Sequence, residues 1–160
     1  MDLGLTGKVA IITGGSEGIG KAAAHRMAAE GARAVIVARR PEVLEAAARD
    51  IEKSTGGVVL PIRGDVAEQE TVNRVLETAL DRFGRVDILV NNAGVSMAKS
   101  FEEVSDEDWE SDFSLKVWGA VRFIRAKRCA CHIPSVSGVC GVVTITKSAR
   151  GSRVSRSATG

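Results

Sequence analysis

The chain has 160 residues, of which 44% are hydrophobic and 26% charged, and a formal net charge of +2 at pH 7. These values are typical of a soluble globular protein with one domain, complete or incomplete. No apolar run approaches the roughly 18 residues that a membrane-spanning helix needs, and the acidic start with a short apolar stretch does not resemble a signal peptide. We therefore expect a cytoplasmic protein that does not contact membranes.

The first part of the chain alternates between short apolar runs and longer segments with helical spacing. Residues 8–13 (KVAIIT) form a continuous apolar run, which is typical of a strand buried on both faces. Strand after helix, repeated, predicts crossover units and an α/β fold with helices on both faces of a doubly wound parallel sheet. The expected strands are 8–13, 33–38, 58–62 and 86–91, and the expected helices are 18–30, 41–53, 68–83 and 105–126.

The composition changes after about residue 126. The last acidic residue is Asp112, whereas nine lysines and arginines and all three cysteines follow it. Residues 127–141 show no convincing period, 142–146 (VVTIT) are a candidate fifth strand, and the Ser, Arg and Gly-rich end is predicted to be disordered. We therefore divide the chain into a domain of residues 1–126 and an atypical basic tail of residues 127–160.

A glycine-rich turn joins the first predicted strand to the first helix. It reads TGGSEGIG over residues 13–20. At such a turn, free N–H groups and the helix dipole favour a pyrophosphate. Gly14 allows a tight turn, Gly18 lets the backbone approach a ligand, and Gly20 allows close helix–strand packing. The alternative is a glycine-rich loop without a ligand, but its position after a first strand favours a dinucleotide.

The spacing Gly-x-x-x-Gly-x-Gly differs from the common Gly-x-Gly-x-x-Gly fingerprint and resembles that of the short-chain dehydrogenase/reductase family. Two further elements match that family in order: Asp65-Val66 after the third predicted strand, and Asn91-Asn92-Ala93-Gly94 after the fourth. The resemblance covers about residues 5–126. It implies a three-layer Rossmann-type fold, which would be incomplete at the C-terminus of this chain.

The resemblance assigns three groups of residues to a nicotinamide dinucleotide. The glycine turn would line its phosphates and ribose, the residues after the third strand would contact the adenine, and those after the fourth strand would lie against the adenosine ribose and brace the sheet. For Asn91, simple capping of the strand end is the alternative. The residues concerned are Gly14, Ser16, Glu17, Gly18, Ile19, Gly20, Asp65, Val66, Asn91, Ala93 and Gly94.

The end of the second predicted strand bears on the choice of cofactor. A carboxylate there would bond a ribose 2′-hydroxyl, whereas a basic group would accept a 2′-phosphate. The chain has Arg39 and Arg40 and no acid at this point, and arginine is a good planar partner for phosphate. We therefore predict NADP(H) over NAD(H). The alternative is that both arginines are solvated at the start of a helix, and Glu17 argues mildly against NADP(H).

The resemblance also implies hydride transfer between the nicotinamide and a small carbonyl or alcohol substrate. In the family a tyrosine gives or takes the proton, a lysine four residues later lowers its pKa, and a serine and an asparagine assist. This chain has no tyrosine, so the Tyr-x-x-x-Lys pair is absent. Lys116 occupies the asparagine's place, as a substitute relay group or a surface lysine. Ser148 follows the candidate fifth strand, near the serine's place.

Two interpretations of function follow. The first is an NADP(H)-dependent oxidoreductase of this family, truncated or frame-shifted near residues 126–127, with an incomplete version of the family's homo-oligomer interface. The second is a catalytically inactive dinucleotide-binding remnant, which the missing tyrosine favours. A genuine divergent C-terminus is the alternative to a frame shift, and the candidate strand 142–146 supports it.

Metal and nucleic-acid sites are not expected in the tail. The spacing of Cys129, Cys131, His132 and Cys140 lacks the usual gaps and the paired second half of a zinc site. The basic residues of the tail are not interleaved with aromatic residues and form no recognisable nucleic-acid-binding motif.

Overall fold

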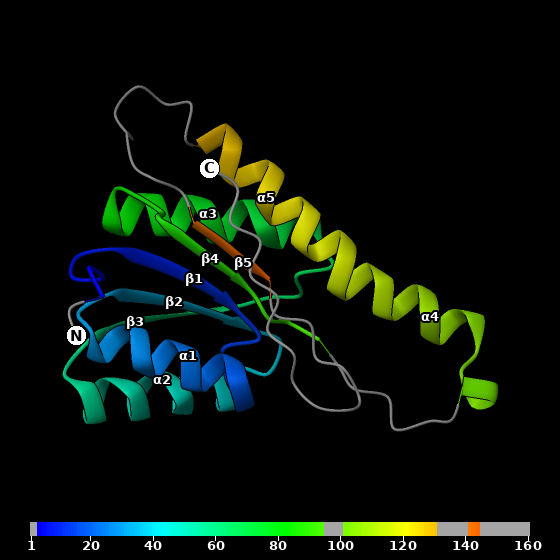
Figure 1. Cartoon of the computed structure of the whole chain (residues 1–160), viewed down its shortest axis with the longest axis horizontal. Helices are drawn as coiled ribbons and strands as arrows, with labels where there is room; N and C mark the ends of the chain where they lie inside the picture. The colour runs from blue at the N-terminus through cyan, green and yellow to red at the C-terminus, as the bar shows by residue number, and fades with distance from the viewer. Residues whose placement is uncertain (1–2, 95–100, 131–140, 145–160) are drawn as a thin grey trace.

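A parallel sheet of five strands forms the centre of the molecule. The computed structural model describes residues 3–94, 101–130 and 141–144. The strands pair in the order β3-β2-β1-β4-β5, so the chain reverses its direction of travel across the sheet after β3 (Figure 1). They are β1 (Val9–Thr13), β2 (Arg33–Ala38), β3 (Val58–Arg63), β4 (Ile88–Asn91) and β5 (Gly141–Thr144).

Helices cover both faces of this sheet. The helices α1 (Gly18–Ala29) and α2 (Pro41–Thr55) lie on one face, and α3 (Gln69–Phe83) and α5 (Gly119–Ala130) lie on the other (Figure 1). Alternate residues of each strand enter the two cores. Ile12 and Ile36 pack beneath α1 and α2, whereas Ile11 and Val35 pack beneath α3 and α5 together with Phe123. The predicted three-layer Rossmann-type fold is confirmed.

The segment before α5 departs from a single regular helix. A short 3₁₀ turn, η1 (Phe101–Glu103), precedes α4 (Asp106–Phe113), and a π-helical turn, η2 (Ser114–Trp118), joins α4 to α5. A capping box begins α4, because the Ser105 hydroxyl accepts from the Asp108 N–H and the Asp108 carboxylate accepts from the Ser105 N–H. The sequence reading gave one continuous helix and missed the π-helical turn.

The structure also extends past the boundary expected at residue 126. Helix α5 continues to Ala130, and β5 occupies residues 141–144 beside β4. The candidate fifth strand is thus confirmed over residues 142–144, while 145–146 lie outside the described residues. No helix in the described ranges is both long and apolar enough to cross a membrane.

Candidate functional site

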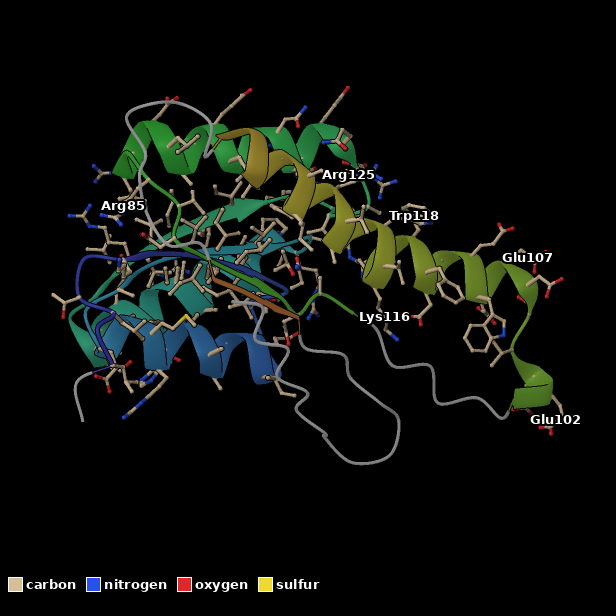
Figure 2. All side chains as sticks on the ribbon, turned by 45° about the horizontal axis from the view of Figure 1, so that its top comes forward. Arg85, Glu102, Glu107, Lys116, Trp118 and Arg125 are labelled. Carbon is tan, nitrogen blue, oxygen red and sulfur yellow. The ribbon has the colours of Figure 1, made fainter. Side chains whose placement is uncertain are left out.

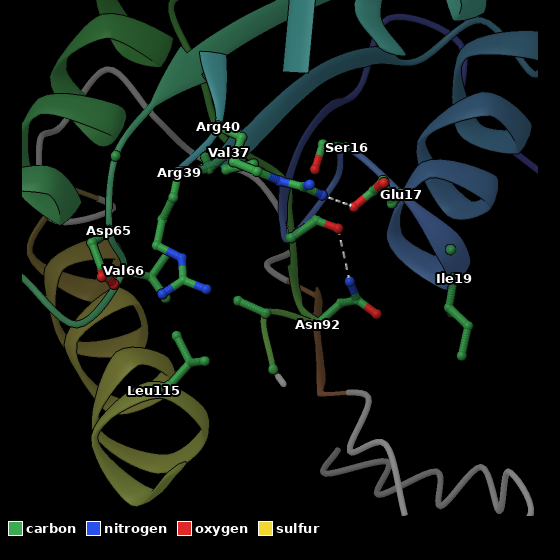
Figure 3. A pocket seen from close by; sticks show the side chains of 16 residues that line it. Ser16, Glu17, Ile19, Val37, Arg39, Arg40, Asp65, Val66, Asn92 and Leu115 are labelled. Atoms are coloured by element: carbon green, nitrogen blue, oxygen red, sulfur yellow. Dashed lines mark hydrogen bonds and ion pairs between the residues drawn. The ribbon is translucent and has the colours of Figure 1, made fainter. Parts of the chain in front are cut away.

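A cleft opens at the carboxyl end of the sheet, beside the point where the strand order reverses. In open α/β sheets this is where ligands bind. Its volume is about 400 Å³, within the roughly 300–1,000 Å³ of small-molecule and cofactor sites. Figure 3 shows the side chains that line it. They come from the loop after β1, the end of β2, the turn after β3, the segment after β4 and the π-helical turn.

Most of the sequence-predicted cofactor residues lie together in this cleft. Those that line it are Gly14, Ser16, Glu17, Gly18, Ile19, Arg39, Arg40, Asp65, Val66, Ala93 and Gly94. Gly20 and Asn91 do not line it. The sequence reading missed five lining residues, which are Val37, Ala38, Gly64, Asn92 and Leu115.

The glycine loop is held against the end of β4 by Thr13 and Asn92. The Thr13 hydroxyl donates to the Val90 carbonyl at 3.3 Å and accepts from the backbone N–H groups of Asn92 and Ala93, both at 3.0 Å. The Asn92 amide in turn donates to the carbonyls of Thr13 and Gly14, both at 3.1 Å, and Figure 3 marks one of these two bonds. These bonds join two segments that are almost 80 positions apart in sequence.

Two positions of the loop require glycine because of their backbone conformation. Gly14 has φ of 66° and Gly18 has φ of 54°, a region that other residues rarely adopt. Gly20 meets a steric limit instead, because a Cβ there would lie 2.2 Å from the Gly14 carbonyl oxygen and 2.4 Å from the Asn92 amide nitrogen. Gly20 therefore serves the close packing of α1 on the loop, as its position in the sequence suggested.

The N-terminus of α1 faces the cleft with uncapped N–H groups. Its N-cap residue, Glu17, makes no side-chain cap hydrogen bond, and the first turn holds no acid. The first N–H groups of a helix have no intrahelical acceptor and attract anions. The loop geometry and this helix end together fit the pyrophosphate of a dinucleotide.

Three charged side chains lie around the end of β2. Arg40 forms an ion pair with Glu17 across the cleft mouth, while Arg39 extends along the side formed by Asp65 and Val66 (Figure 3). In the part of the chain that the structure describes, Arg39 makes no hydrogen bond or ion pair. Asp65 is occupied locally, since its carboxylate accepts from the Ala67 N–H at 2.9 Å at the start of the turn into α3.

Asn91 and Asn92, adjacent in sequence, have different surroundings. Asn91 ends β4 and is only 7% exposed, and among the described residues its side-chain nitrogen has no hydrogen-bond partner. Asn92 lies just beyond the strand and lines the cleft. The sequence reading named Asn91, whereas the structure shows that Asn92 braces the glycine loop. The sequence could have indicated this difference, because side chains alternate between the two faces along a strand and two adjacent asparagines therefore point in different directions.

Of the two candidate catalytic residues, Lys116 lies within the described residues and Ser148 does not. Lys116 is 22% exposed, its ammonium lies 2.7 Å from the Asp112 carboxylate, and a Cβ at Gly94 would lie 3.2 Å from its Cε. Lys116 is thus partly buried and paired with Asp112, and both interpretations of it, a substitute relay group or a surface lysine, stay predictions. The lysine lies beside the cleft, next to Leu115. Ser148 lies outside the described residues, as do Cys131, His132 and Cys140. Within the described ranges, no three His, Cys, Asp or Glu side chains gather as metal ligands.

Comparisons with known proteins identify the family. A family model described as short chain dehydrogenase matches residues 8–153. Glucose 1-dehydrogenase 2 of Bacillus subtilis is 36% identical over 130 residues, which are 81% of this chain and 50% of that protein. The chain therefore belongs to the short-chain dehydrogenase family. The matched region continues beyond residue 126, where the sequence resemblance was expected to end.

Solved structures agree with this assignment. L-sorbose reductase from Gluconobacter frateurii, complexed with NADPH and L-sorbose, has a TM-score of 0.78 and 40% identity, over 90% of this chain and 54% of that one. An alcohol dehydrogenase from Thermococcus sibiricus, complexed with 5-hydroxy-NADP, has a TM-score of 0.71 and 35% identity, over 78% and 53%. The chain thus spans about half the length of these relatives.

Proposed function

We propose that the chain binds NADP(H) in the cleft at the carboxyl end of the sheet. The observation that carries the proposal is the meeting of three features in one cavity: the glycine loop, the two arginines after β2 and the turn after β3. The phosphates would lie at the N-terminus of α1, near Ser16, Gly18 and Ile19. The NADP-type ligands of the two similar structures support the choice of cofactor class.

The remaining lining residues would hold the adenosine half. Arg39 and Arg40 would bind the 2′-phosphate, because guanidinium groups form paired hydrogen bonds with phosphate oxygens. Asp65 and Val66 would contact the adenine ring, and Ala93 and Gly94 would lie against the adenosine ribose. The buried Asn91 would brace the strand end behind them.

For the chemistry, we propose that the site is that of an oxidoreductase, as in the rest of the family, and that this chain lacks one residue that the reaction needs. When bound, NADP(H) supplies or accepts a hydride at a carbonyl or alcohol carbon. The 160 residues include no tyrosine, so the family's proton donor is not among them. We therefore favour cofactor binding without turnover by this chain, and carbonyl reduction or alcohol oxidation as the reaction of the family to which the site belongs.

The site assignment is tested by Gly18→Val. Valine at φ of 54° would strain the loop and occupy the space above the helix N-terminus, so we expect NADPH binding to be lost in a fluorescence titration. Gly56→Val is the matched control, because Gly56 has φ of 67° at the C-terminal end of α2, with nothing within 4 Å of an added Cβ. Equal NADPH affinity in both variants would refute the site.

The cofactor preference is tested by Arg39→Asp. A carboxylate here would repel a 2′-phosphate and accept a hydrogen bond from a 2′-hydroxyl, so the ratio of the NADPH and NADH dissociation constants should reverse. The control is Arg49→Asp on the exposed side of α2, where Arg49 pairs with Glu45 outside the cleft. An unchanged ratio in Arg39→Asp would contradict the 2′-phosphate assignment while leaving cofactor binding itself intact.

We further propose that the helical segment from α4 to α5 mediates self-association in the cytoplasm. It exposes an apolar stripe of Trp109, Phe113, Val117 and Trp118, which are 40–52% exposed. Glu107 lies near its start and Arg125 near its far end (Figure 2), so two antiparallel copies would bring opposite charges together. Trp118→Ser should lower the oligomeric mass in sedimentation, and an unchanged mass would refute this interface.

A further inference from the structure

The two arginines at the end of β2 are in different electrostatic states. Arg40 is paired with Glu17, the residue that precedes α1 in the glycine loop. Arg39 has no such partner among the residues that the structure describes. Figure 3 shows the two guanidinium groups pointing in different directions, one toward Glu17 and the other toward Val66. A phosphate in the cleft would therefore meet one available guanidinium and one that is already paired.

The ion pair bridges the two segments that would surround a 2′-phosphate. Glu17 belongs to the loop after β1, and Arg40 immediately precedes α2. With the pair formed, the three side chains Glu17, Arg39 and Arg40 together carry one positive charge. With Glu17 neutralised they would carry two. The carboxylate therefore lowers the attraction of this corner for a doubly charged group while affecting a neutral hydroxyl far less.

The pair is also weak enough for a ligand to break. The side chains of Arg40 and Glu17 are 62% and 61% exposed, and exposed pairs contribute little because water and salt screen them. A phosphate offers Arg40 more charge and more acceptor oxygens than a carboxylate does. Binding would exchange one partner of Arg40 for another, and the released Glu17 carboxylate would remain close to the phosphate.

From this arrangement we propose that Glu17 is a specificity-determining residue that weakens recognition of the 2′-phosphate by holding Arg40. The inference rests on the proposed binding of NADP(H) in this cleft. It predicts that the chain prefers NADPH less strongly than its two arginines alone would allow. Glu17 acts through Arg40, so it is a positioning residue rather than a phosphate ligand.

The first test replaces the carboxylate by an amide of the same size. We expect Glu17→Gln to lower the dissociation constant for NADPH about tenfold and that for NADH less than twofold, measured by nicotinamide fluorescence at fixed ionic strength. Glu45→Gln is the matched control. Glu45 is also an exposed carboxylate paired with an arginine, Arg49, but it lies on α2 outside the cleft, and both dissociation constants should stay unchanged.

A double-mutant cycle shows whether the effect passes through Arg40. In an Arg40→Gln background, the gain from Glu17→Gln should fall to about twofold, because only screened repulsion between carboxylate and phosphate is left. A gain that stays near tenfold in that background would overturn the proposal, as would a Glu17→Gln variant that binds NADPH no more tightly than the wild type.

The failure of this inference is distinguishable from that of the cofactor site. If the wild-type chain, Glu17→Gln and Glu45→Gln all bind NADPH with the same affinity, cofactor binding by the chain stands and the role of Glu17 is wrong. If none of them binds NADPH or NADH, the proposed function itself is wrong, and with it the inference.

Discussion

The two ends of the parallel sheet use charged residues in opposite ways. At the amino end, Asp87 is 4% exposed, and its carboxylate accepts from the Val9 N–H and from Arg85, with the Lys8 ammonium 3.7 Å away. At the carboxyl end, Glu17 and Arg40 are more than half exposed and Arg39 has no partner in the described part of the chain. Buried, satisfied charge fixes the fold, whereas exposed charge with weak or no partners is available to a ligand.

The largest effect that sharpens this comparison is expected for Asp87→Ala. Removing the carboxylate leaves the buried Val9 N–H without its acceptor and removes the charge-assisted bond from Arg85, which together should cost about 3 kcal/mol of unfolding free energy. Urea denaturation followed by circular dichroism measures the loss. The control, Asp50→Ala, removes the exposed partner of Lys21 and should change stability much less. Equal losses would remove the contrast between buried and exposed charge.

A smaller effect is expected at the carboxyl end for Gly20→Ala. The new methyl group would meet the Gly14 carbonyl and the Asn92 amide, and such overpacking typically costs about 1–3 kcal/mol. Because the glycine loop must shift, NADPH affinity should fall at least tenfold. Gly84→Ala is the control, because Gly84 caps the end of α3 outside the cleft with φ of 75°, an added Cβ there has nothing within 4 Å, and the change should cost stability without altering NADPH affinity. Unchanged NADPH affinity in Gly20→Ala would argue against a rigid loop.

The smallest expected effect is the acid sensitivity of the amino end. Burial raises the pKa of Asp87, but the bonds from Arg85 and Val9 outweigh it and hold the pKa below its ordinary value of 3.8. A lowered folded-state pKa gives stability that is complete above the unfolded-state value and is lost as the pH falls through the folded-state value. Urea midpoints should therefore decline below about pH 4, and less so in Asp87→Asn. If the urea midpoints of the wild type and of Asp87→Asn decline equally with falling pH, the acid sensitivity comes from other groups.

The fold and much of the cleft followed from local sequence signals. Each apolar run of a parallel sheet is buried on both faces and flanked by glycine or a helix start, so residues 8–13 and 33–38 were identified nearly to the residue. The glycine turn and the residues after β4 then fall at one edge of the sheet by topology alone. These features need no knowledge of which side chains touch.

What the sequence did not predict depends on contacts between distant segments. The Glu17–Arg40 pair joins residues 23 positions apart, and the bracing by Asn92 depends on which of two adjacent asparagines leaves the strand. The partial burial of the Lys116 side chain follows from the close approach of η2 to Gly94. Hydrophobic periodicity describes one helix or strand at a time and carries no information about side-chain contacts between distant segments.

The π-helical turn between α4 and α5 changes the direction in which the side chains of the two helices point, although the helical backbone is continuous. Each residue of an α-helix advances the side chains by about 100°, and a π turn holds one residue more than the α-helical period allows. The rotation keeps Phe123 fully buried on the sheet while the Trp109 and Phe113 side chains upstream stay 40% and 52% exposed. Deleting one residue from 114–118 would restore the regular α-helical period. The side chains of α4, including Trp109 and Phe113, would then be rotated about the helix axis relative to α5, and no strand would change.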